Sequence, residues 1–237
     1  VGSTNDYAKE IGNKVSGGTL IISEQQTKGK GRLGRVWKSK SGDGIWMSLI
    51  IKPKIEPYKA SFLTLVAGAS VVKALSNLDV EASIKWPNDI IVHNKKICGI
   101  LTELSAEMER VNYVVIGIGI NIKTIDFPDE IKEKATSLYK EGYKLSRVDI
   151  VRQFCIEFEK LYKGYILDGN KQDTLELCRK YSAIIGKQVY VIKNNKRELV
   201  KCIDINENGN LIVKEKNGEI QEIMSGEVSI RGVKGYV

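Results

Sequence analysis

A long apolar segment at residues 60–78, ASFLTLVAGASVVKALSNL, constrains the fold of this 237-residue chain more than any other stretch. Its apolar residues recur at helical spacing and cover most of the circumference of the helix that they predict. A helix of this kind is buried on more than one side. The segment therefore predicts a long helix that is buried on more than one side. No apolar run approaches the 18 or more residues of a membrane span, so no membrane partner is expected.

Runs of apolar and β-branched residues on both sides of this helix predict the strands of a sheet. Residues 19–23 (TLIIS) follow two glycines and predict a buried strand. Residues 111–122 (VNYVVIGIGINI) are apolar almost throughout and predict a strand that two glycines interrupt. Further strands are predicted over residues 44–52 and 83–104, the latter with a hairpin near Asn94, and further helices over residues 3–15, 151–165 and 173–181.

The pattern changes after Ile185, where only short β-type runs follow. KQVYVIK, RELVKCIDI, NLIVKE, EIQEIM and EVSIRG are separated by turns rich in Asn, Gly and charged residues. This spacing is typical of a small barrel. We therefore expect two domains, residues 1–184 and residues 185–237, and an α+β fold class.

The charge, histidine and cysteine content of the chain limit the classes of function that it can have. The net charge of +8 indicates an anionic ligand or partner. A single histidine, His93, argues against His-based triads and multi-His metal sites. No CxxC pair occurs, so neither a zinc site nor a redox pair is indicated, and a reducing, cytoplasmic compartment is expected. Each cysteine lies in an apolar stretch and is expected to be a buried free thiol: Cys98, Cys155, Cys178 and Cys202.

Residues 25–38, QQTKGKGRLGRVWK, form a basic loop with three glycines that spell GxGxxG. A dinucleotide-binding fingerprint also needs a helix at the last glycine and an acid about 20 residues further on, where Lys54 stands here. The phosphate-loop pattern fails because Arg35 and Val36 replace the required Lys and Ser/Thr. Alternating glycines and cations suit an anion-binding loop. A solvated loop, and a nucleic-acid patch in which Trp37 and Trp46 stack bases, remain open alternatives.

Four further motifs occur with this loop in a fixed order: STN (3–5), KWPND (85–89), NKKICGIL (94–101) and VIGIGIN (115–121). Over residues 1–121 the set resembles the catalytic domain of biotin protein ligases, and ATSL (135–138) and GEVSIRG (226–232) extend the resemblance weakly. The family's loop is usually written GRGRxGR, so Lys30 keeps a cation but loses a guanidinium fork. The resemblance implies a mixed β-sheet with flanking helices, related to class II aminoacyl-tRNA synthetases, followed by an SH3-like β-barrel.

The resemblance also implies an activity. Biotin and ATP, with Mg²⁺, would form biotinyl-5′-AMP, and the biotinyl group would pass to a lysine of a biotin carboxyl carrier protein domain. That domain would belong to acetyl-CoA carboxylase or to another biotin-dependent carboxylase. No nucleic-acid partner is expected for this chain, and a homodimer is left open. Lipoate or octanoate ligases share the fold and the chemistry, but they usually carry an RRxSGGG-type loop with a nearby His, which is absent here.

By resemblance, three residues carry the chemistry. Lys96 reaches the reacting carboxylate and the α-phosphate, Asp89 orients the acceptor ammonium, and Arg32 holds the adenylate. The residues expected to bind biotin are Ser3, Thr4, Asn5, Gln26, Lys30, Gly31, Arg32, Lys96, Gly99, Gly117 and Gly119. Those expected to bind ATP are Arg32, Arg35, Trp37, Asn88, Lys96, Asn121, Glu227 and Arg231. No metal ligand is assigned.

The residues alone leave simpler roles open for several of these positions. Residues 3–5 also suit a helix cap, and Trp86 suits the core. Asp89 suits a turn or a salt bridge, and a peripheral salt bridge suits Glu227 and Arg231 equally well.

Overall fold

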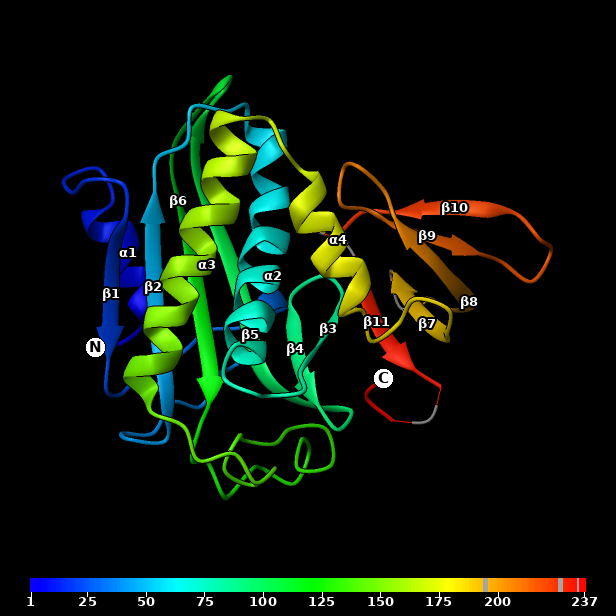
Figure 1. Cartoon of the computed structure of the whole chain (residues 1–237), viewed down its shortest axis with the longest axis horizontal. Coiled ribbons are helices and arrows are strands. Elements are labelled where there is room, and N and C mark those ends of the chain that lie inside the picture. Colours follow the sequence, from blue (N-terminus) through cyan, green and yellow to red (C-terminus); the bar gives the residue numbers. More distant parts are fainter. Residues whose placement is uncertain (194–195, 226–227, 234) are drawn as a thin grey trace.

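The computed structural model describes residues 1–193, 196–225, 228–233 and 235–237. Glu227, one of the residues expected to bind ATP, lies outside the described residues. Two β-sheets lie side by side, and the helices pack on the larger one (Figure 1). The predicted fold class is confirmed: a sheet with flanking helices followed by a smaller sheet.

The larger sheet has six strands in the order β1-β2-β6-β5-β4-β3. Every pair of neighbouring strands is antiparallel. Parallel pairing is confined, among the described residues, to isolated bridges such as Lys96–Ala135 and Ile84–Ser182. The bounds are β1 (Thr19–Ser23), β2 (Gly44–Ile51), β3 (Ser83–Lys85), β4 (Asp89–Val92), β5 (Lys95–Glu107) and β6 (Arg110–Asn121).

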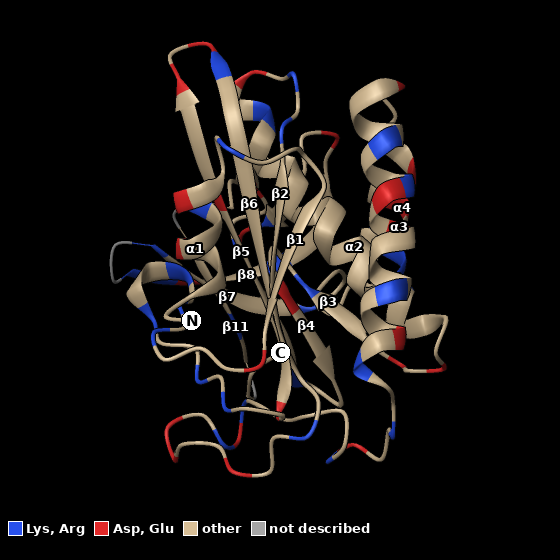
Figure 2. Ribbon diagram, turned by 90° about the vertical axis from the view of Figure 1, so that its left-hand side faces the viewer, with Lys and Arg blue, Asp and Glu red and all other residues tan. Residues whose placement is uncertain are grey.

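Helices cover the two faces of this sheet unequally. The short helix α1 (Thr4–Ile11) lies on one face, and α2 (Phe62–Ser76), α3 (Arg147–Leu167) and α4 (Gln172–Lys180) lie on the other (Figure 2). Helix α2 packs between the sheet and α3, and most of its side chains are buried all round. Its predicted burial on more than one side is confirmed. Two 3₁₀ turns complete this part, η1 (Arg32–Gly34) and η2 (Pro57–Ser61).

Side chains alternate between the two faces of each strand, because the period of a strand is two. In β2, Met47 joins the main core under α2, whereas Ile50 joins a small separate core under α1. In β6, Ile116 and Ile118 face the main core. Gly117 and Gly119 therefore face the side of the sheet that carries α1, and the region next to α1 is free of bulky side chains at these two positions.

The smaller sheet contains the five predicted runs, in the order β10-β9-β8-β7-β11. Their bounds are β7 (Gln188–Lys193), β8 (Lys196–Ile205), β9 (Leu211–Lys214), β10 (Ile220–Ile223) and β11 (Ser229–Gly232). Trp86 joins the two parts, since its indole N–H donates a hydrogen bond of 3.0 Å to the carbonyl of Gly209. Buried side chains of both parts belong to one hydrophobic core, so the domain boundary near residue 185 stays a prediction.

Four expectations need correction. The strand TLIIS is not buried: β1 is an edge strand with one neighbour, and Ile22 is 55% exposed. Cys155 is exposed on α3, while the other three cysteines are buried. Trp46 is a core residue, 1% exposed, and cannot stack a base. One helical stretch, Pro57–Ser76, is long and apolar enough to cross a membrane, but 72% of its 18-residue apolar window is buried inside the protein.

Candidate active site

A pocket lies where the first turn of α1, the basic loop and the glycine-bearing parts of β5 and β6 meet. All the residues predicted to bind biotin line it, and so do Met47, Ile100, Leu101 and Ile118, which the sequence analysis did not single out. Four residues of the ATP set also line it, namely Arg32, Trp37, Asn88 and Lys96. An accessible volume of about 50 Å³ holds a few water molecules. A bicyclic ligand therefore requires the loop or the side chains over the pocket to move.

Hydrogen-bonding groups cluster at the α1 end of the pocket. The backbone N–H and the hydroxyl of Thr4 donate to Oε1 of Gln26 at 2.8 and 3.0 Å. The hydroxyl of Ser48, which is fully buried, lies 2.7 Å from Oγ1 of Thr4 and 2.6 Å from Oδ1 of Asn5. Ser48 has one proton for these two acceptors, so a ligand N–H can supply the other hydrogen bond. The sequence analysis missed Ser48, although a lone hydroxyl in an apolar strand is a usable signal.

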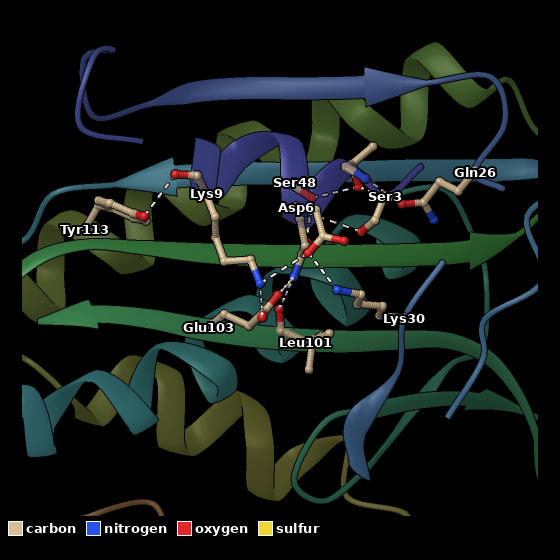
Figure 3. A network of polar contacts seen from close by, with 11 residues as sticks. Ser3, Asp6, Lys9, Gln26, Lys30, Ser48, Leu101, Glu103 and Tyr113 are labelled. Atoms are coloured by element: carbon tan, nitrogen blue, oxygen red, sulfur yellow. Dashed lines mark hydrogen bonds and ion pairs between the residues drawn. The ribbon is translucent and has the colours of Figure 1, made fainter. Parts of the chain in front are cut away.

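Asn5 is held on its other side by an acidic residue of β5. Its Nδ2 donates to Oε2 of Glu103 at 2.8 Å and to the carbonyl of Leu101 at 3.3 Å. Nζ of Lys9 pairs with Oε1 of Glu103 at 2.6 Å, and this hydrogen bond raises the pKa of Lys9 (Figure 3). Both ends of the Asn5 amide therefore bind protein atoms, which fixes its orientation. Ser3 caps α1 by accepting from the N–H of Asp6 at 3.4 Å, as predicted.

The basic loop is tied to α1 through an ion pair. Nζ of Lys30 lies 2.8 Å from Oδ1 of Asp6, which also contacts Nζ of Lys9 at 3.2 Å (Figure 3). The hydrogen bond from Lys30 lowers the pKa of Asp6. Asp6 is another residue that the sequence analysis did not assign. Its carboxylate holds the ammonium of Lys30, the residue that replaces an Arg of the family's loop.

Three glycines of β5 and β6 have neighbouring side chains so close that a Cβ would not fit without moving them. Gly99 and Gly119 are paired across β5 and β6, and the indole of Trp37 lies on both. A Cβ added at Gly119 would lie 2.6 Å from Nε1 of Trp37, and one added at Gly99 would lie 3.0 Å from its ring. At Gly117 it would collide with Oδ1 of Asn5. Nε1 of Trp37 is buried and has no acceptor among the described residues, so it can donate to a ligand.

Three residues meet at the other end of the pocket. Lys96, at the start of β5, forms an ion pair with Oδ1 of Asp89, and its Nζ lies 5.2 Å from the ring centroid of Trp37. The side chain of Asp89 is 15% exposed and lies behind Lys96. Burial works to raise the pKa of Asp89, but the charge of Lys96 and the hydrogen bonds that the carboxylate accepts lower it on balance. Burial lowers the pKa of Arg32, which extends from the loop toward the same carboxylate.

Asn121, a further ATP candidate, does not line the pocket. Asn121 is buried at the end of β6, and its Nδ2 donates to the carbonyl of Thr136 at 3.1 Å. Thr136 belongs to ATSL, and its N–H donates to the carbonyl of Lys96 at 2.9 Å. Arg35 and Arg231 do not line the pocket either. Their predicted contacts with ATP stay predictions.

The described residues include no group of three or more His, Cys, Asp or Glu side chains that could hold a metal ion. Asp89 pairs with Lys96, which lines the pocket, and both of its oxygens already have partners. These donors fit an ion that arrives with the phosphates and keeps its waters, rather than a resident metal.

The fold and the pocket define a class of protein that binds the polar head of a ligand beside α1. The other end of the ligand then lies next to cations. The family model "Biotin/lipoate A/B protein ligase family" matches residues 1–121, and the model "Biotin protein ligase C terminal domain" matches residues 184–231. The chain belongs to the biotin protein ligase family. The predicted family is confirmed.

Relatives of this chain include bifunctional enzymes and a solved ligase. The bifunctional ligase/repressor BirA of Bacillus spizizenii is 39% identical over 97% of this chain and 72% of its own length. BirA of Escherichia coli is 28% identical over 99% of this chain and 73% of its own length. The structure of biotin protein ligase from Aquifex aeolicus in complex with biotin and ATP has a TM-score of 0.84 and 31% identity, and the match covers 97% of this chain and 95% of that one.

Proposed function

We propose that this chain is an ATP-dependent ligase that activates biotin as biotinyl-5′-AMP and transfers the biotinyl group to a lysine of a biotin carboxyl carrier protein domain. One observation carries the proposal. The residues predicted to bind biotin come from four separate motifs, and they line a single pocket with Lys96 and Arg32 at one end. A family match over residues 1–121 and 184–231 supports the same activity.

The polar end of the pocket suits the ureido ring of biotin. This ring has two N–H donors and one carbonyl acceptor. Thr4 and Asn5 supply oxygen atoms for the donors, and the buried Ser48 contacts both of these oxygens. The backbone and side chains of the loop supply N–H groups for the carbonyl. The indole of Trp37 and the glycine-bearing parts of β5 and β6 offer an apolar surface for the bicycle. The valeryl chain then extends toward Lys96.

The first step is adenylation. An oxygen of the biotin carboxylate attacks the α-phosphate of ATP, the bond between the α- and β-phosphates breaks, and pyrophosphate leaves. Negative charge grows on the phosphate oxygens, where the ammonium of Lys96 and the guanidinium of Arg32 stabilise it. Mg²⁺ enters with ATP as part of the substrate. The buried N–H of Trp37 lies at the same end and can donate to the bound ligand.

The second step is transfer. The amine of the carrier lysine attacks the carbonyl of the mixed anhydride, the amide forms, and AMP leaves with the electrons of the broken bond. A lysine with a pKa near 10.4 must first lose a proton, which costs about 4.6 kcal/mol at pH 7. Asp89 is the carboxylate nearest to Lys96 and can orient the incoming ammonium or take its proton.

The partner and the assembly are further parts of the proposal. The acceptor is the carrier domain of acetyl-CoA carboxylase or of another biotin-dependent carboxylase, in the cytoplasm. Homodimers would form along β1, because an edge strand presents unpaired backbone groups and Ile22 is exposed there. Sedimentation of the wild type and of Ile22→Lys tests this, since the charge would prevent pairing at that edge.

The experiment that tests the activity is release of pyrophosphate from ATP in the presence of biotin or of lipoate. Release of pyrophosphate with biotin but not with lipoate supports the proposal. Release with lipoate but not with biotin would assign the chain to the lipoate ligases. A titration of DNA binding against salt addresses the remaining alternative. A nucleic-acid module would show a steep slope of affinity against salt concentration.

A further inference from the structure

Tyr236 is a buried tyrosine whose hydroxyl reaches the candidate active site from the C-terminal part of the chain. It follows β11, and the residue is 9% exposed. Its hydroxyl donates a short hydrogen bond to Oδ2 of Asp89. Asp89 lies 147 positions earlier in the sequence, at the start of β4. The contact therefore joins the C-terminal segment directly to a residue of the proposed transfer step.

The two oxygens of Asp89 have different partners. Oδ1 forms the ion pair with Lys96, and Oδ2 accepts from Tyr236. Rotation of the carboxylate would break both contacts, so together they fix its plane. Lys96 lines the pocket, whereas Asp89 lies behind it. When Lys96 turns toward a reacting carboxylate and phosphate, Oδ1 loses its partner while Oδ2 keeps the hydrogen bond from Tyr236.

Lys85 holds Tyr236 in this position. Its Nζ donates a hydrogen bond of 2.6 Å to the carbonyl of Tyr236 and lies 3.3 Å from the centroid of the tyrosine ring. Lys85 is 2% exposed, and it lies opposite Asp89 in the antiparallel pairing of β3 with β4. An ammonium buried to this degree is costly unless it is well partnered. The strands thus place the amine of Lys85 where it contacts both the ring and the backbone of Tyr236.

The charges around Asp89 come from several elements. Lys96 comes from β5, Lys85 from β3 and Arg32 from the basic loop, and all three act on the carboxylate. Arg231 and Arg35 act on Tyr236, and burial beside Asp89 raises the pKa of the tyrosine well above its usual value. Burial also raises the pKa of the neighbouring thiol of Cys98, so it stays neutral. The tyrosine therefore keeps its proton and remains a donor to Asp89 throughout the working pH range.

We propose that Tyr236 is a positioning residue for Asp89, and that Lys85 anchors it there. The hydrogen bond from Tyr236 keeps the carboxylate ionised and correctly turned after Lys96 has released it, so that the freed Oδ1 faces the ammonium of the acceptor lysine. A buried carboxylate without any partner would instead take up a proton or turn away. This inference rests on the proposed role of Asp89 in transfer.

The test compares Tyr236→Phe, Asp89→Asn and the double variant with the wild type. Tyr236→Phe removes the hydroxyl and keeps the ring. Tyr181→Phe is the matched control, because it removes a hydroxyl that lies 3.1 Å from Oγ of Ser76, away from the pocket. Two single-turnover rates are measured: formation of biotinyl-AMP, and transfer from preformed biotinyl-AMP to a carrier domain. Transfer is followed as a function of pH, and thermal unfolding checks that each variant is folded.

We expect Tyr236→Phe to slow transfer about tenfold, the scale of one hydrogen bond to a charged acceptor, and to leave adenylate formation near the wild-type rate. Loss of the donor raises the pKa of Asp89, so the acidic limb of the transfer profile shifts to higher pH. The double variant should be no slower than Asp89→Asn, because the tyrosine acts through the carboxylate. Tyr181→Phe should leave both rates and the profile unchanged.

The inference is overturned if Tyr236→Phe transfers biotin as fast as the Tyr181→Phe control. It is also overturned if the double variant is slower than Asp89→Asn by the full factor that Tyr236→Phe causes in the wild type. A different result would overturn the role of Asp89 itself. If Asp89→Asn slows adenylate formation rather than transfer, the carboxylate serves the first step. Tyr236 is then a positioning residue only if its variant slows that same step.

Discussion

Nη1 of Arg32 donates a hydrogen bond of 2.6 Å to Oδ1 of Asn88, which joins the basic loop to the turn before β4. Asn88 is itself fixed, because its Nδ2 donates to the carbonyl of Ile100 at 3.0 Å. Nη2 of Arg32 donates to the carbonyls of Ser225 and Val228 at 2.8 and 3.3 Å. One guanidinium therefore holds the loop against two distant parts of the chain. Neutral carbonyls are weaker partners than a phosphate, so an adenylate can replace them.

Arg32→Gly should release biotinyl-AMP before it is transferred, because the variant loses the guanidinium that closes the loop over the adenylate. The expected result is biotinylation of lysines on bystander proteins such as serum albumin, measured by streptavidin blotting. Lys38→Gly adds the same flexibility at an exposed loop cation and serves as the control. Loss of activity without stray labelling would assign Arg32 to adenylation instead of retention.

Lys96→Ala should slow adenylate formation by a factor on the order of 100 or more, the usual scale for removal of a charged transition-state contact. Biotin affinity should change much less, because the polar head binds at the other end of the pocket. Isothermal titration and pyrophosphate release measure the two quantities. Lys95→Ala is the matched control, since this neighbouring lysine does not line the pocket. Near-normal turnover of the Lys96 variant would rule out its assigned role.

Ser48→Ala should weaken biotin binding roughly fivefold, because a buried hydroxyl that contacts both Thr4 and Asn5 is worth about 1 kcal/mol. The KM for biotin should rise while the KM for ATP stays constant. Ser70→Ala is the control, because this fully buried serine bonds only to the Val66 carbonyl of its own helix at 2.6 Å. An equal loss of affinity in both variants would indicate a general packing effect.

The buried ammonium of Lys85 should make stability depend on pH. Burial lowers its pKa from 10.5 to about 7. Between pH 7 and about 10 the unfolded chain therefore binds more protons than the folded chain, and this group makes the free energy of unfolding rise with pH. Lys85→Met removes the titration, so the wild type should gain stability relative to this variant as the pH rises through the window. Urea unfolding at several pH values measures the difference.

Lys160→Met, on the exposed face of α3, is the control for this measurement. Its stability should follow that of the wild type at every pH. Parallel pH profiles for the wild type and Lys85→Met would show that Lys85 keeps a normal pKa in the folded protein. Its contact with Tyr236 would then bind a fully charged ammonium.

The sequence predicted the elements that depend on local pattern and missed contacts that depend on topology. The buried helix α2 and the apolar strand β6 follow from periodicity and composition, and both are present in the structure. Ile22 was expected to be buried because its strand is apolar, but an apolar pattern does not tell which strand lies at the edge of a sheet. Tyr236 could not be predicted to reach Asp89, since no local rule relates residues 147 positions apart.

The basic loop should become ordered on ligand binding, and trypsin can detect this. Two of its apolar side chains give little support, since Leu33 is 67% exposed and Val36 is 79% exposed, whereas Trp37 packs on β5 and β6. Its backbone is held by a few hydrogen bonds, such as that from the N–H of Trp37 to the carbonyl of Gly29 at 2.9 Å. Ordering roughly ten residues costs about 1 to 2 kcal/mol each in backbone entropy, which these contacts offset poorly. The six cations between Lys28 and Lys40 also repel one another until an anion binds.

Each of those cations is a site for trypsin. We expect rapid cleavage between Lys28 and Lys40 in the free protein, strong protection by biotin with ATP, and none by DNA, because only the adenylate supplies a phosphate inside the loop. The Lys and Arg residues of α3 are the internal control, since a formed helix does not fit a protease active site. Mass spectrometry of the early fragments gives the positions of the cuts. Slow cleavage of the free protein would show that the loop is already closed before biotin binds, and rapid cleavage unchanged by the ligands would show that it never closes over them.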